Sequence, residues 1–330
     1  MRALVRSLAS VIAGVPGSRQ MLRWAAVAPV SMKSRQFERL AIALAGRCGM
    51  GDALVETNAG IRSDLRVLLP PAKHQMLFGR PSNYVHERAT LALAQFLSRR
   101  TRAFIDVGAN EGLFSLAVAC DTATQSGLSI HAFEPDVDVF ARLQANLRRH
   151  FASVRVNNLA VSSHAGSATF YRNLLDDLSG TLLAADRSDG QQLVPVKINT
   201  ISLAEYMKQH GITNAGVKID VEGGAVDVWE GLSQSLGSVD WLICEMLGPE
   251  IEAKLPQRIM STSGWYAYYI RDFDLVQSID GHYRYRAPFY NWLFCAEPPE
   301  RLADMLAQTR FKIIASPPHQ QSDAGRGLER

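Results

Sequence analysis

Acidic residues, glycines and an asparagine occupy a turn that follows a short apolar run. The turn extends from Asp106 to Gly112 and contains Gly108 and Asn110. Glycine at a strand-to-helix turn lets a ligand approach the backbone, and the free N–H groups of the following helix can hold its polar atoms. A dinucleotide fingerprint would require glycine at two further positions, where the chain has Asn110 and Leu113. The turn therefore argues against nicotinamide-dependent chemistry.

Glu134 ends the next apolar run, about 20 residues beyond that turn. A carboxylate at this point can accept hydrogen bonds from both hydroxyls of a ribose that lies across the strand ends. Asp106 ends the neighbouring run, and the turn between the two acids lacks the pyrophosphate fingerprint. The arrangement predicts an adenosine ligand without a pyrophosphate, and S-adenosylmethionine fits that description.

Two further acids, Asp220 and Glu222, follow another apolar run, where a substrate would face the methyl group. Methyl transfer mainly requires in-line positioning, and a hydroxyl acceptor gains further if a carboxylate or imidazole takes its proton. Asp220 and Glu222 are therefore the candidate catalytic residues, and Glu245 at the end of a fifth run could join them. Three alternatives remain open: Glu222 caps the next helix, the three acids bind Mg²⁺, or the proton goes to His86, His282 or solvent.

The hydropathy pattern indicates which elements place these residues together. From about residue 84, longer amphipathic segments alternate with five short runs that are apolar throughout: Ala103 to Val107, Ser129 to Glu134, Val154 to Asn158, Gly216 to Asp220 and Val239 to Glu245. Runs that are apolar on both faces are typical of parallel strands covered by helices on each side. The pattern predicts a doubly wound α/β fold with a mostly parallel sheet.

The segments between the runs carry helical features. Residues 136–150 have acids in their first turn and bases in their last turn, which matches the helix dipole at both ends. Residues 225–236 repeat the spacing of apolar positions expected of a helix. Beyond residue 258, the aromatic-rich segments 265–270 and 289–296 predict an antiparallel pair of strands at one edge of the sheet, separated by a polar stretch.

Four motifs lie at the ends of these runs: Phe-Ile-Asp-Val-Gly-Ala-Asn-Glu-Gly at 104–112, Phe-Glu-Pro at 133–135, Asn-Leu-Ala-Val at 158–161 and Val-Lys-Ile-Asp-Val-Glu-Gly at 217–223. In order and spacing they resemble the motifs of the FkbM family of S-adenosylmethionine-dependent methyltransferases. The resemblance covers residues 84 to 296 and implies a class I methyltransferase fold, which is Rossmann-like, with S-adenosylmethionine as cofactor.

The resemblance also implies roles for individual residues. The methionine part of the cofactor would be held by Asp106, Gly108, Asn110 and Gly112. Glu134 would bind the ribose, and Asn158 would lie near the adenine. Glu87, in a helix ahead of the first strand, would lie close to the cofactor.

The acceptor implied by the resemblance is a hydroxyl group of a sugar, polysaccharide or polyketide, and fold-level analogy does not choose among these. We therefore expect an O-methyltransferase that acts on a small-molecule or carbohydrate acceptor. Two alternatives are a methyltransferase-like fold used only for binding or assembly and, less favoured, a nicotinamide-dependent oxidoreductase. Thermal stabilisation by S-adenosylmethionine, its demethylated product or NAD would separate them.

Composition excludes some partners. The chain has 330 residues, with 35 Lys and Arg against 32 Asp and Glu, so its net charge of +3 is far from that of a nucleic-acid-binding surface. Four cysteines lie far apart without a C-x-x-C pair, so we expect no zinc site and assign no metal ligands. Free thiols in apolar surroundings favour a reducing, cytoplasmic location.

The ends of the chain differ from its centre. Residues 1–75 predict a helical and loop-like extension, in which six basic residues precede the first acid, Glu38. We expect this extension to pack on the domain or on a partner subunit, with peripheral membrane contact or proteolytic processing as alternatives. Residues 76–315 would form the methyltransferase domain, and residues 316–330 a flexible tail. No run is long enough to span a bilayer.

Overall fold

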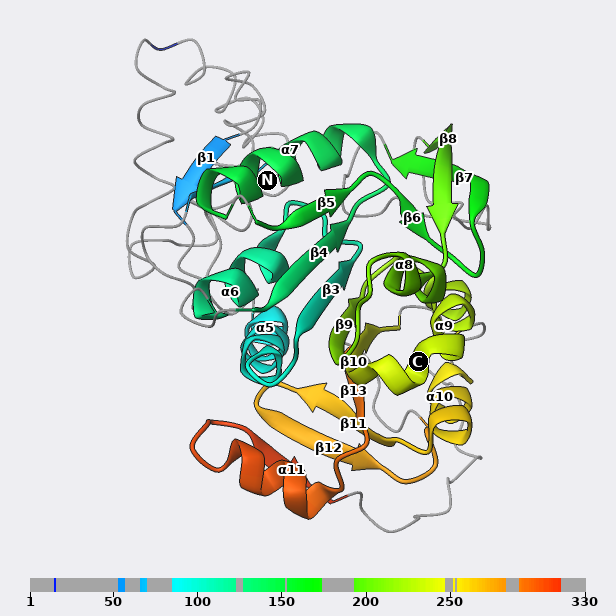
Figure 1. The fold of residues 1–330 in the computed structure, drawn as a ribbon. Coiled ribbons are helices and arrows are strands. Elements are labelled where there is room, and N and C mark those ends of the chain that lie inside the picture. Colours follow the sequence, from blue (N-terminus) through cyan, green and yellow to red (C-terminus); the bar gives the residue numbers. More distant parts are fainter. Residues whose placement is uncertain are drawn as a thin grey trace, which may run out of the picture.

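The structure is a computed structural model of the 330-residue chain (Figure 1). It describes residue 15 and residues 53–56, 66–69, 85–122, 127–151, 153–173, 193–246, 252, 254–282 and 291–315. The tail at 316–330 and most of the predicted extension at 1–75 therefore lie outside the described residues. So do the basic positions ahead of Glu38 on which the predicted membrane contact depends.

The centre of the fold is a nine-stranded sheet with the order β14-β12-β11-β13-β10-β9-β3-β4-β5. Its parallel half contains β3 (Ala103–Val107), β4 (Ser129–Phe133), β5 (Arg155–Asn157), β9 (Ala215–Ile219) and β10 (Val239–Glu245). All five strands coincide closely with the five apolar runs. Every residue of β3 and β9 is buried, as expected for central strands covered on both faces. The predicted doubly wound α/β fold is confirmed.

The second half of the sheet is mixed. It contains β11 (Tyr266–Arg271), β12 (Asp274–Ser278), β13 (Asn291–Cys295) and β14 (Lys312–Ile314). The predicted antiparallel pair is present as β11 and β13, and β13 also lies antiparallel to β10. This pair is not the sheet edge, because β12 pairs with β11 and β14 pairs with β12. The stretch expected to be only polar thus contains a strand.

Helices cover both faces of the sheet (Figure 1). One face packs against α5 (Val85–Ser98), α6 (Leu113–Thr122), α7 (Val137–His150) and α11 (Pro299–Leu306). The other packs against α8 (Leu203–Gln209), α9 (Ala225–Leu232), the short 3₁₀ helix η4 (Ser233–Ser238) and α10 (Leu255–Ser263). No helix in the described part of the chain is long and apolar enough to cross a membrane.

Helix α7 begins and ends as the sequence predicts. The Asp136 side chain caps it by accepting hydrogen bonds from the N–H groups of Asp138 and Val139, at 2.9 and 3.2 Å. Its last turn is basic, which suits the negative end of the helix dipole. This helix starts directly after the strand end that carries Glu134, so its cap fixes the backbone beside that residue.

A small second sheet follows β5. It consists of β6 (Ala160–Val161), β8 (Leu193–Ile201) and β7 (Gly166–Asn173), in that order. Arg172 at the end of β7 forms ion pairs with Asp136 and Asp138 at the start of α7. The small sheet is therefore tied to the same helix terminus that adjoins Glu134.

Two short strands precede the domain. β1 (Ala53–Glu56) and β2 (Arg66–Leu69) pair antiparallel, where the sequence pattern predicted helix or loop. The side chain of Asn146 on α7 holds this ribbon: its Oδ1 accepts from the N–H of Leu68 at 2.6 Å, and its Nδ2 donates to the Leu68 carbonyl at 3.2 Å. Nδ2 also donates to the carbonyl of Glu111 at 2.9 Å. The ribbon thus connects through α7 to the turn after β3.

Candidate active site

The chain changes direction within the sheet between β3 and β9. From β3 it proceeds through β4 and β5 on one side, whereas β9 and β10 lie on the other side. In open α/β sheets ligands bind outside the carboxyl ends of the strands at such a switch point. Asp106, Glu134 and Asp220 lie at the carboxyl ends of three adjacent strands, β3, β4 and β9 respectively. The sheet thus brings together the three acids that the sequence singled out.

The turn after β3 has the strained backbone that close ligand approach requires. Gly108, Asn110 and Gly112 all have positive φ, of 74°, 51° and 89°. A positive φ costs energy in a residue other than glycine, so Asn110 marks a position of stored strain, as is common at functional sites. A Cβ on Gly108 would lie only 1.8 Å from the carbonyl oxygen of Asp220. The turns after β3 and β9 are therefore in direct contact.

Glu134 is the acid that this turn holds most directly. One carboxylate oxygen, Oε2, accepts from the N–H of Asn110 at 3.1 Å, and Oε1 accepts from the N–H of Asp136 at 2.9 Å. The residue is 7% exposed. Burial raises the pKa of Glu134 to about 8, although these N–H donors favour the ionised form. Each oxygen keeps a further lone pair for a ligand hydroxyl.

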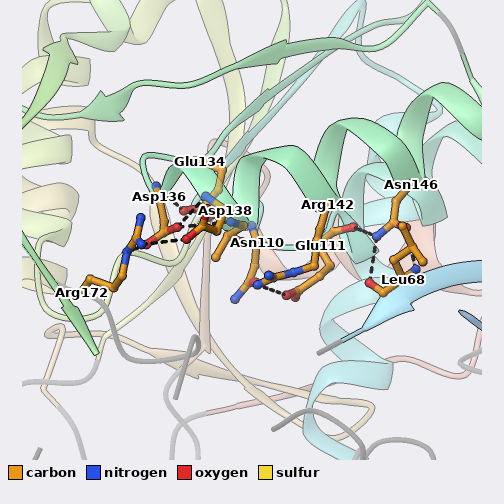
Figure 2. A network of polar contacts seen from close by, with 10 residues as sticks. Leu68, Asn110, Glu111, Glu134, Asp136, Asp138, Arg142, Asn146 and Arg172 are labelled. Carbon is orange, nitrogen blue, oxygen red and sulfur yellow. Dashed lines mark hydrogen bonds and ion pairs between the residues drawn. The ribbon is translucent and has the colours of Figure 1, made fainter. Parts of the chain in front are cut away.

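Asn158 supports this strand end from the next one. Its Nδ2 donates to the carbonyls of Glu134 and Pro135, at 2.9 and 3.0 Å. The residue is itself exposed after β5, so it fixes the course of the Glu134 loop. Figure 2 shows Glu134 and Asn110 beside the first turn of α7, with Arg172 on one side and Glu111, Arg142 and Asn146 along the helix on the other.

Asp106 lies beneath the turn and is completely buried. Its Oδ2 accepts from both the N–H and the hydroxyl of Ser115, at 3.0 and 2.7 Å, and so caps the start of α6. Its Oδ1 lies 4.0 Å from Nζ of Lys218 and has no hydrogen-bond partner among the described residues. Burial raises the pKa of the Asp106 carboxyl, while Lys218 opposes that shift.

Lys218 on β9 lies between Asp220, at the end of the same strand, and Asp106 on the neighbouring strand β3. It is 3% exposed, and Nζ lies 2.8 Å from Oδ2 of Asp220 and 4.5 Å from the centroid of the Phe114 ring. Buried lysines normally lose their charge, but Asp220 and Asp106 raise the pKa of this ammonium above its ordinary value. In the sequence, Lys218 stands out only as part of the motif at 217–223. A lysine in a fully buried strand was the signal that could have identified it.

Glu222 and Glu245 complete the group. Glu222 has a φ of 49°, so the turn after β9 is strained like the turn after β3. Burial and the neighbouring Asp220 raise the pKa of Glu245 to about 10. At the start of α9, Gly224 occupies the N-cap position, and the buried carboxylate of Glu252 accepts from the N–H of Ala225 at 3.1 Å.

Two further expectations concern Glu87 and a bound metal ion. Glu87 lies in the first turn of α5, and its side chain is outside the described residues. Within the described part of the chain, no three His, Cys, Asp or Glu side chains lie close enough to hold a metal ion together. Asp220, Glu222 and Glu245 are not such a group.

The arrangement fits an adenosine ligand. A buried carboxylate at the end of β4 has lone pairs left for two hydroxyls, and the adjoining turn has positive φ at three positions without the dinucleotide spacing. On the far side of that turn lie Lys218 and Asp220, where a reacting group would be placed. The turn therefore has Glu134 on one side and Asp220 with Lys218 on the other.

Comparison with known proteins agrees with this geometry. A family model described as "Methyltransferase FkbM domain" matches residues 106–271, half of the chain. The chain is 32% identical over 162 residues to the 31-O-demethyl-FK506 methyltransferase FkbM of Streptomyces tacrolimicus, covering 41% of this chain and 60% of that protein. It is 30% identical over 142 residues to the hexuronic acid methyltransferase AglP of Haloferax volcanii, covering 43% of this chain and 54% of that protein.

The chain spans less than two thirds of the length of both relatives. Among solved structures, the METTL16 methyltransferase domain aligns with a TM-score of 0.41 and 13% identity, over 79% of this chain and 81% of that one. Assignment rests on the family match, which begins at Asp106 and includes the turn, Glu134, Asp220 and Glu245. The chain therefore belongs to the FkbM methyltransferase family.

Proposed function

We propose that this chain transfers the methyl group of S-adenosylmethionine to a hydroxyl group of a small-molecule or carbohydrate acceptor. The observation that carries the proposal is the junction of three strand ends. Glu134 accepts from the N–H of Asn110, and the same turn packs through Gly108 against the backbone of Asp220. A cofactor bound across this turn has its ribose beside Glu134 and its reactive end beside Asp220.

The residues around the turn fit S-adenosylmethionine. When bound, the cofactor supplies a methyl group that its sulfonium sulfur has already activated. Glu134 holds the two ribose hydroxyls, and Asn158 keeps the Glu134 loop in place beside the adenine. Gly108, Asn110 and Gly112 allow the methionine part to approach the backbone, while Asp106 anchors the start of α6 beneath it.

Asp220 and Glu222 are the proposed catalytic residues on the acceptor side. The Asp220 side chain is 28% exposed, so a bound acceptor can reach it although Lys218 pairs with it from below. Positioning an acceptor in line with the methyl group supplies most of the rate enhancement. A carboxylate that takes the hydroxyl proton adds about 10²- to 10⁴-fold.

The acceptor class is inferred from the relatives. One is named for an O-demethylated substrate, and the other is named for a hexuronic acid. Together they favour a hydroxyl acceptor on a sugar or another small natural product.

Binding tests the cofactor assignment first. We expect thermal unfolding of the chain to shift upward with S-adenosylmethionine and with S-adenosylhomocysteine, and to remain unchanged with NAD. Stabilisation by NAD alone would point to an oxidoreductase. Absence of stabilisation by all three would point to a protein that uses this fold only for binding or assembly.

Single-turnover methyl transfer then tests the acceptor side. Labelled S-adenosylmethionine is offered with free glucuronic acid, galacturonic acid or fractionated cell extract as acceptor. We expect Asp220→Asn to retain cofactor affinity and to lose about 10²-fold or more in rate. Glu205→Gln, an exposed change on α8, serves as the control. Wild-type rates in both Asp220→Asn and Glu222→Gln would eliminate a carboxylate base.

A further inference from the structure

Asp220 and Glu245 form a pair at the ends of two neighbouring parallel strands. Cys244 of β10 pairs in register with Ile219 of β9, so the next residue of each strand, Glu245 and Asp220, lies at the same level. Their side chains are within hydrogen-bonding reach of each other. A hydrogen bond between two carboxyl groups requires that one of them carries a proton.

The surroundings differ for the two members of the pair. Lys218 lies on Asp220, with Nζ 2.8 Å from Oδ2. Glu245 is partly buried and has Asp220 and Glu222 as its acidic neighbours. Two adjacent carboxyls do not both ionise readily, and the one beside a cation ionises first. Burial and Asp220 accordingly raise the pKa of Glu245 to about 10.

The charged groups around the pair come from strands β3 and β9 and from the turn after β9. Asp106 faces it from β3, Lys218 lies on β9, and Glu222 lies in the turn after β9. Helix α6 packs over Lys218 with the uncharged ring of Phe114. Among the described residues, Lys218 is thus the cation of this cluster, and it is nearer to Asp220 than to Asp106, at 2.8 against 4.0 Å.

We infer that Glu245 is a positioning residue for the reaction: it keeps a proton and donates a hydrogen bond to Asp220, while Lys218 holds Asp220 ionised and ready to accept the acceptor's proton. The inference deepens the proposed function and rests on it for the use made of Asp220. The hydroxyl proton passes to Asp220 as the acceptor oxygen bonds to the methyl carbon, and the electron pair of the broken C–S bond stays on sulfur. Glu245 retains its own proton throughout.

Infrared difference spectroscopy of the full chain, without cofactor or acceptor, measures this arrangement directly. Protonated and ionised carboxyls have separate bands, so a variant reveals the state of the group it removes. We expect Glu245→Gln to lose one protonated-carboxyl band at neutral pH. Lys218→Met should add such a band in mildly acidic solution, at a pH where the wild type lacks it, because loss of a neighbouring cation raises a carboxyl pKa by about 1 to 3. Lys218→Arg should retain the wild-type spectrum.

Matched variants assign the bands. The band added in Lys218→Met must disappear in the double variant Lys218→Met, Asp220→Asn; if it persists, it belongs to Asp106 and the inference is overturned. Lys208→Met, an exposed change on α8, should alter nothing. Near-ultraviolet circular dichroism checks that each variant folds. If Lys218→Met does not fold, the spectra of the two single variants Lys218→Arg and Glu245→Gln test the inference instead.

An unchanged protonated-carboxyl spectrum in Glu245→Gln would show that Glu245 is ionised, which overturns the inference. This outcome is separate from failure of the proposed function. The spectra need no cofactor, whereas the proposed function fails if S-adenosylmethionine does not bind. A chain that binds the cofactor but has an ionised Glu245 would keep the function and lose the proton-sharing pair.

Discussion

Glu134 shows how one buried side chain can be both well bonded and poorly ionised. Its two oxygens accept from the N–H groups of Asn110 and Asp136, yet burial raises its pKa to about 8. Hydrogen bonds from both ribose hydroxyls require acceptor oxygens, which the ionised carboxylate provides. Ligand binding below about pH 8 must therefore release a proton from this group.

The consequence is a pH-dependent affinity for the ribose. Adenosine is the suitable probe, because the α-amino group of the full cofactor titrates in the same range. We expect adenosine affinity, measured by calorimetry, to rise with pH up to about 8 and then to level off. Glu134→Gln should abolish this rise and weaken binding by about 10- to 100-fold at high pH, since a hydrogen bond to a charged group contributes about 1.5 to 3 kcal/mol.

Exposed Glu205→Gln is the control for that experiment and should behave as the wild type. A flat pH profile in the wild type, or the same profile in Glu134→Gln, would remove Glu134 from the ribose site.

The sequence was informative about residues whose type is unusual for their place. Glu134 and Asp220 stand out because acids follow apolar runs, and Asn110 because it replaces a glycine in a tight turn. Partners of these residues could not be predicted. The placement of α6 determines that Asp106 accepts from Ser115. The distances between side chains at the strand ends determine that Lys218 pairs with Asp220.

At the level of elements, contact between two turns positions the site. The turn after β3 reaches the turn after β9 because Gly108 has no side chain to keep them apart. Any other residue at this position would have to adopt a φ of 74°, and its Cβ would collide with the Asp220 carbonyl. The glycine therefore has a structural role in addition to any contact with the cofactor.

A pair of glycine variants separates strain from crowding. Gly211 also has a positive φ, of 61°, but a Cβ there would meet nothing within 4 Å. We expect Gly211→Ala to destabilise the chain by about 1 kcal/mol, the cost of the left-handed conformation alone. Gly108→Ala should cost at least about 3 kcal/mol, because the two turns must also move apart. Equal losses in denaturant unfolding would contradict the close approach.

The small second sheet, which the sequence did not predict, buries little apolar surface. Strands β3 and β9 are buried throughout and were predicted, whereas β8 mixes exposed, half-buried and buried residues without regular alternation. The core of the small sheet consists of few apolar side chains, centred on Phe170 and Ile198. Pairing there depends on neighbouring strands more than on hydropathy, so no run of apolar residues marks it.

At the level of the whole molecule, the site joins parts that lie far apart in the sequence. Helix α7 connects the ribbon of β1 and β2 through Asn146, the turn after β3 through Glu111, and the small sheet through Asp136 and Arg172. Figure 2 shows these contacts following one another along the helix. The family motifs predicted the centre of this assembly, and the attachments around it required the structure.

The central claim is that the carboxyl ends of β3, β4 and β9 form an S-adenosylmethionine site. A crystal structure of the chain with S-adenosylhomocysteine tests it most directly. We expect both ribose hydroxyls to donate to the Glu134 carboxylate, the methionine part to lie along the Gly108 to Gly112 turn, and the sulfur to face Asp220. A ligand bound elsewhere, or one whose ribose makes no contact with Glu134, would contradict the account.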